Sequence, residues 1–99
     1  MNESKQYKII RPPLSRNFSL PSRDDLLKVT VGDLAKVIFQ VGDEPPERMW
    51  IVITDLSNAM DEWVGTINND AIGKETAAAL PDGTVVKFHP LDVIAIDKK

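Results

Sequence analysis

The chain contains no cysteine among its 99 residues. Disulfide bridges, thiolate metal ligands and cysteine nucleophiles are therefore excluded. Disulfides are common in secreted domains and rare in proteins of reducing compartments. The absence of cysteine predicts an intracellular protein, and we expect a cytoplasmic one.

Long apolar runs are also lacking. A membrane-spanning helix needs about 20 consecutive apolar residues, and no stretch of this sequence approaches that length. Near the N-terminus, the apolar pair Ile9 and Ile10 is soon followed by Pro12 and Pro13, so the apolar core of a signal peptide is missing. We therefore expect a soluble protein with no membrane partner.

Residues that commonly carry catalysis are scarce. His89 is the only histidine, and a histidine that acts as a general base usually needs a carboxylate to orient it. His89 with Asp92 or Asp70 is the pattern that would support a small hydrolase or lyase. The favoured interpretation of His89 is a polar residue at a bend, because Pro90 follows it and restricts its backbone to extended conformations.

Binding motifs for cofactors and metals are absent too. The sequence has no glycine-rich phosphate loop and no nucleophile elbow. One histidine without cysteine leaves only oxygen ligands for a metal, and the acids of residues 42–47 lack the spacing of a calcium loop. We expect no cofactor and no metal.

The strongest structural signal is the run of residues 48–56. It is rich in β-branched and aromatic residues, which suit a pleated strand better than a helix. Side chains alternate between the two faces of a strand, and here both sets are largely apolar: Met49, Ile51 and Ile53 on one face, Trp50, Val52 and Thr54 on the other. The run predicts a central strand with both faces covered.

Four more strands are predicted around it. Residues 34–41 alternate with one apolar set toward the core: Ala35, Val37, Phe39 and Val41. Residues 62–68 form the next strand, with Gly65 at a bend or bulge. Residues 84–88 and 93–96 are the last two strands, separated by a sharp break at His89 and Pro90.

Two short helices are also predicted. Ser22 and Asp25 form a capping-box pattern that starts a helix, and the alanine-rich residues 74–80 favour a second one that Pro81 stops. Together the elements indicate a mainly β fold: a small, five-stranded, SH3-like, strongly bent antiparallel barrel. An open antiparallel α+β sheet is the alternative.

The first part of the chain differs from the rest. Residues 1–21 contain three of the seven prolines, so we expect an extended N-terminal segment, followed by a single barrel-like domain over residues 22–99. Residues 1–30 carry a net charge of +3, whereas residues 31–99 carry −6. Phosphate neutralisation needs clustered Lys and Arg, so nucleic acid is not expected on the folded surface. A nucleic-acid-binding barrel that uses the basic N-terminal arm stays as an alternative.

The order of the segments resembles a known family. The stretches Val31 to Phe39, Glu47 to Thr54, Gly65 to Asp70 and Gly83 to Phe88 are similar to the YegJ-like small uncharacterised bacterial domains. The resemblance covers about residues 22–96 and implies a similar β-rich fold, but it carries no chemistry. This sequence departs from the family pattern in a longer loop over residues 57–61 and in residues 1–21.

Three groups of residues are candidates for binding. Adjacent strands would bring Trp50 and Trp63 near each other, and exposed aromatic pairs anchor protein interfaces, although core positions are the commoner fate of strand tryptophans. The loop at residues 42–47 is acidic and offers Asp43 and Glu44 to a partner. The amides and carboxylate of Asn68, Asn69 and Asp70 suit either a tight turn or a polar ligand.

These features favour a non-enzymatic protein-interaction module. We expect a protein partner and an immunity, inhibitory or regulatory role, because an acidic loop, an aromatic pair and a basic apolar N-terminal segment are present while catalytic patterns are not.

Overall fold

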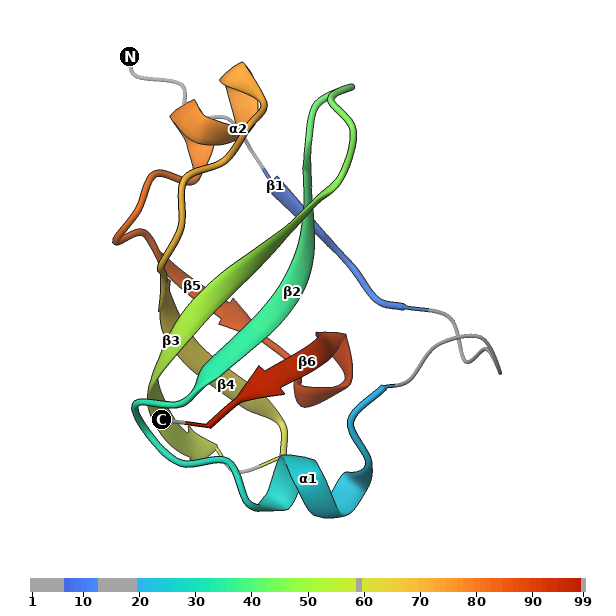
Figure 1. The fold of residues 1–99 in the computed structure, drawn as a ribbon, viewed down its shortest axis with the longest axis vertical. Helices are drawn as coiled ribbons and strands as arrows, with labels where there is room; N and C mark the ends of the chain where they lie inside the picture. Colours follow the sequence, from blue (N-terminus) through green and yellow to red (C-terminus); the bar gives the residue numbers. More distant parts are fainter. Residues whose placement is uncertain (1–6, 13–19, 59, 99) are drawn as a thin grey trace.

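The computed structural model describes residues 7–12, 20–58 and 60–98. Their antiparallel sheet is strongly curled into a half-barrel (Figure 1). The strands are β1 (Tyr7–Ile10), β2 (Leu34–Val41), β3 (Glu47–Asn58), β4 (Glu62–Ile67), β5 (Val85–Phe88) and β6 (Val93–Asp97). The helices are α1 (Arg23–Leu27), α2 (Lys74–Ala79) and the 3-10 turn η1 (Pro90–Asp92). The predicted mainly β, strongly bent antiparallel fold is confirmed, with β1 as a sixth strand.

β3 lies at the centre of the sheet, as residues 48–56 predict, but only one of its faces is fully covered: Trp50 and Val52 on the outer face are half-buried and Thr54 is exposed. β3 pairs with β2, where Lys36 is opposite Trp50, and with β4, where Val52 is opposite Thr66. β4 then pairs with β5, so β2 to β5 form a meander in chain order. Pairing on both edges gives the backbone groups of β3 hydrogen-bond partners on both sides.

Two strands share the other edge of β2. β1 pairs with one half, with Ile10 opposite Ile38, and β6 pairs with the other half, with Ala95 opposite Lys36. Only residues 89–92 separate β5 from β6, although the two strands belong to opposite edges of the sheet. The sheet must curl for so short a connection to reach across, which explains the half-barrel.

β1 lies inside residues 1–21, the predicted extended segment before the domain. The backbone is extended there, as expected, and it is hydrogen-bonded to β2 over the whole of Tyr7–Ile10. The ring of Tyr7 packs edge-on against buried Phe39, with centroids 5.5 Å apart. Tyr7–Ile10 therefore belong to the sheet, because the edge of β2 offers both hydrogen-bond partners and apolar surface. Residues 1–6 and 13–19 of the segment lie outside the described residues.

Alternation along the strands fills the core as predicted. The inward-facing residues of β2 and β3 have no exposed surface: Ala35, Val37, Phe39, Val41, Met49, Ile51 and Ile53. The rest of the core comes from Leu26, Val29, Trp63, Ile67, Leu80, Val86, Phe88 and Val93. Each fully buried large apolar side chain stabilises the fold by about 1.5–3 kcal/mol.

Gly65 permits β4 to lie against β3. A Cβ at this position would overlap the Ile51 side chain and the carbonyl oxygen of Val52. The pairing register also shifts between Ile53 and Asp55, a bulge of the kind that bends a sheet. The irregularity predicted at Gly65 is therefore present.

Each α-helix contributes a buried side chain to the packing. At α1, the Ser22 hydroxyl accepts a hydrogen bond from the Asp25 N–H at 3.1 Å, and the Asp25 carboxylate accepts one from the Ser22 N–H at 3.0 Å. This is the predicted capping box, and it lets Leu26 enter the core. α2 packs against β2 and places Thr76 and Leu80 in buried positions.

Candidate functional site

His89 acts as a cap for η1. Its Nδ1 accepts a hydrogen bond from the Leu91 N–H at 2.9 Å, and its own N–H donates to Asp92 Oδ2 at 2.9 Å. Asp92 Oδ1 accepts from Arg11 Nε at 3.0 Å. Both oxygens of Asp92 therefore have partners other than the imidazole. Asp70 is exposed in the loop before α2.

The acidic loop at residues 42–47 caps α2. Glu44 Oε1 accepts hydrogen bonds from the Thr76 N–H at 2.8 Å and the Thr76 hydroxyl at 2.7 Å, while Oε2 accepts from the Glu75 N–H at 3.0 Å. Glu47 accepts from the N–H groups of Ile72 and Gly73 at 2.8 and 2.7 Å. Of the three loop acids, Asp43 alone is exposed, and the other two are half-buried. Glu44, a candidate for binding a partner, thus has a structural role.

α2 needs this external cap because its own N-cap residue is Gly73, which makes no side-chain cap hydrogen bond. The first N–H groups of a helix have no partner within the helix and attract negative charge. A Cβ at Gly73 would overlap the Glu44 carboxylate. Glycine at position 73 therefore leaves room for the Glu44 carboxylate, which takes the place of an N-cap side chain.

The two tryptophans lie on opposite faces of the sheet. Trp63 is 2% exposed and packs edge-on against Phe88, with ring centroids 6.1 Å apart. Trp50 is half-buried on the outer face, and the ammonium of Lys36 lies 4.6 Å from the centre of its ring. Such a cation–π contact contributes about 0.5–1 kcal/mol at an exposed site. The structure does not bring the indoles together, because the side chain of Trp63 points into the core and that of Trp50 lies on the outer face.

Asn68 and Asn69 hold the backbone of Trp50. The Asn68 N–H donates to the Trp50 carbonyl at 2.8 Å, and Asn69 Oδ1 accepts from the Trp50 N–H at 2.5 Å. The two asparagines therefore extend the hydrogen-bonded ladder between β3 and β4 by one residue. Asn68 uses its backbone N–H, and Asn69 uses its side-chain oxygen. Asn68 and Asp70 are exposed. Of the candidate binding residues, the structure gathers Trp50, Asn68 and Asn69.

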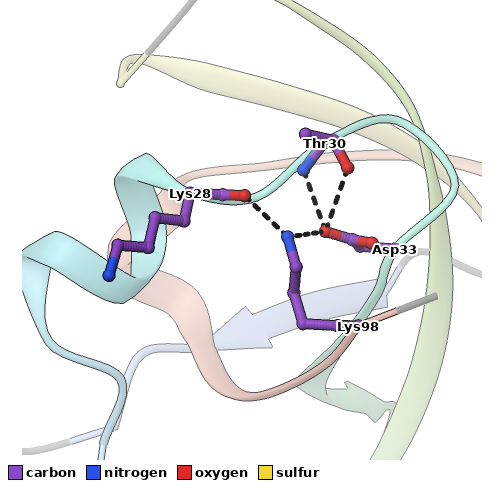
Figure 2. A network of polar contacts seen from close by, with 4 residues as sticks. All are labelled: Lys28, Thr30, Asp33 and Lys98. Atoms are coloured by element: carbon purple, nitrogen blue, oxygen red, sulfur yellow. Dashed lines mark hydrogen bonds and ion pairs between the residues drawn. The ribbon is translucent and has the colours of Figure 1, made fainter.

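A second polar network fastens the end of β6. Asp33 is 2% exposed, and its Oδ2 accepts from the Thr30 N–H at 2.9 Å, the Thr30 hydroxyl at 3.3 Å and Lys98 Nζ at 2.6 Å (Figure 2). Lys98 Nζ also donates to the Lys28 carbonyl at 2.6 Å. A buried carboxylate needs such partners to offset its lost hydration. The network joins α1, the turn before β2 and β6.

A groove of about 530 Å³ lies beside this network, between α1 and β6. It is lined by Leu20, Pro21, Asp25, Lys28, Ile94, Ala95, Ile96 and Lys98. Ligand sites usually combine apolar walls with polar groups aimed at one point. Here Asp25 caps α1 and Lys98 pairs with Asp33, so two of the three charged groups already have structural roles.

The outer face of β1, β2 and β3 gathers basic and apolar side chains. We call it the outer basic face, and it consists of Lys8, Ile10, Lys36, Ile38, Gln40, Arg48 and Trp50. On β2 and β3 these positions alternate with buried residues, and on β1 they alternate with Tyr7 and Ile9, which face Phe39 and the core; all seven are half-buried or exposed. The pairing places Ile10 beside Ile38, Ile38 beside Arg48, and Lys36 beside Trp50.

Sequence reasoning identified Trp50 on this face but not the cations around it. The alternation of residues 34–41 does point Lys36 and Ile38 away from the core. The contribution of Lys8 depends on the pairing of β1 with β2, which no local pattern indicates.

The described residues include no candidate metal site and no candidate membrane-spanning helix. Within residues 7–12, 20–58 and 60–98, no group of three or more His, Cys, Asp or Glu side chains has the arrangement to hold a metal ion. In the same part of the chain, no helix has the length and apolar character to cross a membrane.

Comparison with known proteins gave no match: no family model, no curated protein and no solved structure matches this chain.

Proposed function

We propose that this protein is a non-enzymatic interaction module that docks another protein through the outer basic face. The observation that carries the proposal is a set of three cations that form no ion pair with any described carboxylate. Lys36 and Arg48 lie next to the half-buried Trp50, and Lys8 lies at the rim of the same face. We further propose that the module works in the cytoplasm in an immunity, inhibitory or regulatory role, and that its resemblance to the YegJ-like domains is one of fold.

The cations of this face differ from others in the molecule. Arg11 and Lys98 pair with Asp92 and Asp33 and serve the fold. Among the described residues, no carboxylate forms an ion pair with Lys8, Lys36 or Arg48. The whole chain has a net charge of −3, so this positive surface is a local exception. Such surfaces steer the approach of a partner with opposite charge.

The apolar members of the face supply the contact area. Trp50, Ile38 and Ile10 are each half-buried, so part of every side chain is open to contact. Tryptophan and arginine are enriched among the residues that dominate protein interfaces. A partner that covers this face would remove apolar surface from water and give Arg48 a hydrogen-bonding partner.

Two observations favour protein over nucleic acid as the partner. Lys36 already occupies one face of the Trp50 ring, where a base would otherwise stack. The net negative charge of the chain opposes the approach of a polyanion beyond the three local cations. The face is therefore better suited to the mixed charge and apolar surface of a protein.

The experiment is affinity capture from the source cell with three forms of the full chain. These are the wild type, the face variant Lys36→Glu with Arg48→Glu, and a control variant, Lys74→Glu with Lys87→Glu, which makes the same charge change at exposed positions of α2 and β5. Thermal melts must first show that all three fold. We expect a protein retained by the wild type and the control and lost by the face variant.

Equal retention by all three forms would overturn the proposal. It would also fail if nuclease treatment abolished the capture, because the partner would then be a nucleic acid.

A further inference from the structure

We infer that the partner contacts the outer basic face with an extended segment that presents a carboxylate and an apolar side chain at alternate positions. The inference rests on the proposed function and names the chemistry of the partner. It comes from the order in which cations and apolar residues are arranged on β2 and β3.

The four central residues of the face form a checkerboard. Along β2, Lys36 is followed two residues later by Ile38, and along β3, Arg48 is followed two residues later by Trp50. The strands are antiparallel, so Lys36 lies opposite Trp50 and Ile38 lies opposite Arg48. Each cation therefore has an apolar neighbour both along its own strand and across from it.

The spacing of this pattern matches an extended peptide. Residues two apart on a strand point the same way and are about 6.8 Å apart. A segment running along β2 or β3 meets a cation and then an apolar side chain at that interval. A carboxylate and an apolar residue at positions i and i+2 of the segment satisfy both at once. The same pairing works along either strand.

The checkerboard also argues against simpler partners. A uniform polyanion would place charge over Ile38 and Trp50, where it gains nothing and loses hydration. A purely apolar surface would cover Lys36 and Arg48 and leave their charges without water or partner. An alternating segment avoids both costs, and the exposed cation Lys8 at the rim of the face adds long-range attraction for its acids.

The side chains directly opposite the cations are uncharged, which fits this occupant: Gln40 for Lys8, Ile38 for Arg48, and Trp50 and Ala95 for Lys36. The exposed acid Asp97 on β6 lies opposite Leu34, two residues before Lys36, and forms no ion pair with it. Gln40 donates to the carbonyl of Glu44. Lys36 has only the indole ring as a partner among the described residues. An ammonium over a ring keeps N–H groups that point away from it. A carboxylate from outside can therefore bind Lys36 without breaking an existing ion pair.

The test uses three labelled probes with the full chain. The first is a repeated Ser-Glu-Ser-Leu peptide, the second has serine in place of every leucine, and the third is an oligo(dT) strand. Fluorescence anisotropy gives each affinity, and amide chemical shifts locate the bound probe. We expect the alternating peptide to bind at least about tenfold more tightly than the other two probes, because it alone meets both kinds of residue.

Variants separate the site from nonspecific attraction. Lys36→Glu with Arg48→Glu should lower the affinity for the alternating peptide by at least about tenfold. Lys74→Glu with Lys87→Glu should leave that affinity unchanged. The changes in amide chemical shift caused by the alternating peptide should concentrate on β2 and β3. Equal binding by the serine peptide, or tighter binding by oligo(dT), would show a simple anion site and overturn the inference.

The two proposals fail in different ways. If the alternating peptide does not bind, but the face variant still loses a captured protein, the partner chemistry is wrong and the docking surface stands. If the alternating peptide binds the face variant as tightly as the wild type, the peptide site lies elsewhere and the inference is wrong.

Discussion

Glu44 binds Thr76 through one carboxylate oxygen, which accepts both the backbone N–H and the hydroxyl of that residue, 32 positions away in the sequence. The contact ties the loop between β2 and β3 to the start of α2. It also means that the acidic loop, which in the sequence resembles a surface for a partner, serves mainly to cap a helix.

The first prediction concerns this cap. Glu44→Ala removes the acceptor for three donors, and Thr76 is fully buried. Hydrogen bonds to charged groups contribute about 1.5–3 kcal/mol each, and unpaired donors add to the loss. We expect the free energy of unfolding to fall by about 2–4 kcal/mol, measured by urea denaturation. The exposed Asp43→Ala is the control and should stay within about 0.5 kcal/mol of wild type. Similar losses in both variants would contradict the capping role.

The second prediction concerns the close approach at Gly65. Gly65→Ala forces a methyl group into the Ile51 side chain and the Val52 carbonyl oxygen, and overpacking of this kind costs about 1–3 kcal/mol or more. Gly83→Ala is the control, because nothing lies within 4 Å of a Cβ there and only its φ of +92° is strained. That strain costs about 1 kcal/mol. Thermal melts measure the stability that each variant loses. A larger loss of stability for Gly83→Ala than for Gly65→Ala would show that steric contact at Gly65 is unimportant.

The third prediction concerns the ion pair that holds the chain after β1. Arg11 Nε lies 3.0 Å from Asp92 Oδ1, with 53% of the arginine side chain exposed but only 10% of the aspartate. We expect a double-mutant cycle with Arg11→Ala and Asp92→Ala to give a coupling of about 0.5–1 kcal/mol, reduced by solvent around the arginine.

Asp92→Ala alone should cost more than Arg11→Ala, since it also removes the acceptor for the His89 N–H. A coupling near zero would mean that β1 is held by its strand pairing and its packing against the core, without help from the ion pair.

The fourth prediction concerns pH. The backbone N–H of Ser22, and then its hydroxyl, hold the pKa of Asp25 below its ordinary value of 3.8. A lowered pKa means that the folded state favours the charged carboxylate. Its stabilising contribution to α1 is therefore present above pH 3.8 and is lost as the pH falls through the lowered value. Ser22→Ala should raise the pKa of Asp25 toward the ordinary value, measured by NMR titration of the carboxyl carbon.

Asp55 supplies the matched control for this titration. The Ser57 hydroxyl, and then its backbone N–H, lower the pKa of Asp55. Ser57→Ala should therefore raise the pKa of Asp55 and leave that of Asp25 in place. A change at both carboxyls in either variant would point to a general loss of structure.

Local patterns in the sequence were sufficient to predict most elements of the fold. The capping box at Ser22 and Asp25 depends on residues within one helical turn. The buried set in residues 34–41 depends only on a period of two. Such signals are predictable because the physical cause and its effect lie within a few residues of each other.

The tertiary structure alone decided which of the chemically active groups remain available. Trp50 was predictable as a candidate for binding, but its cationic surroundings were not, since they depend on how β1, β2 and β3 pair. Glu44 and Asp92 have partners that lie far along the chain, so no local pattern shows that their carboxylates are occupied. The alternation of side chains along a strand determines the face on which a residue lies. Whether that residue can still bind a partner depends on distant segments that the fold brings next to it.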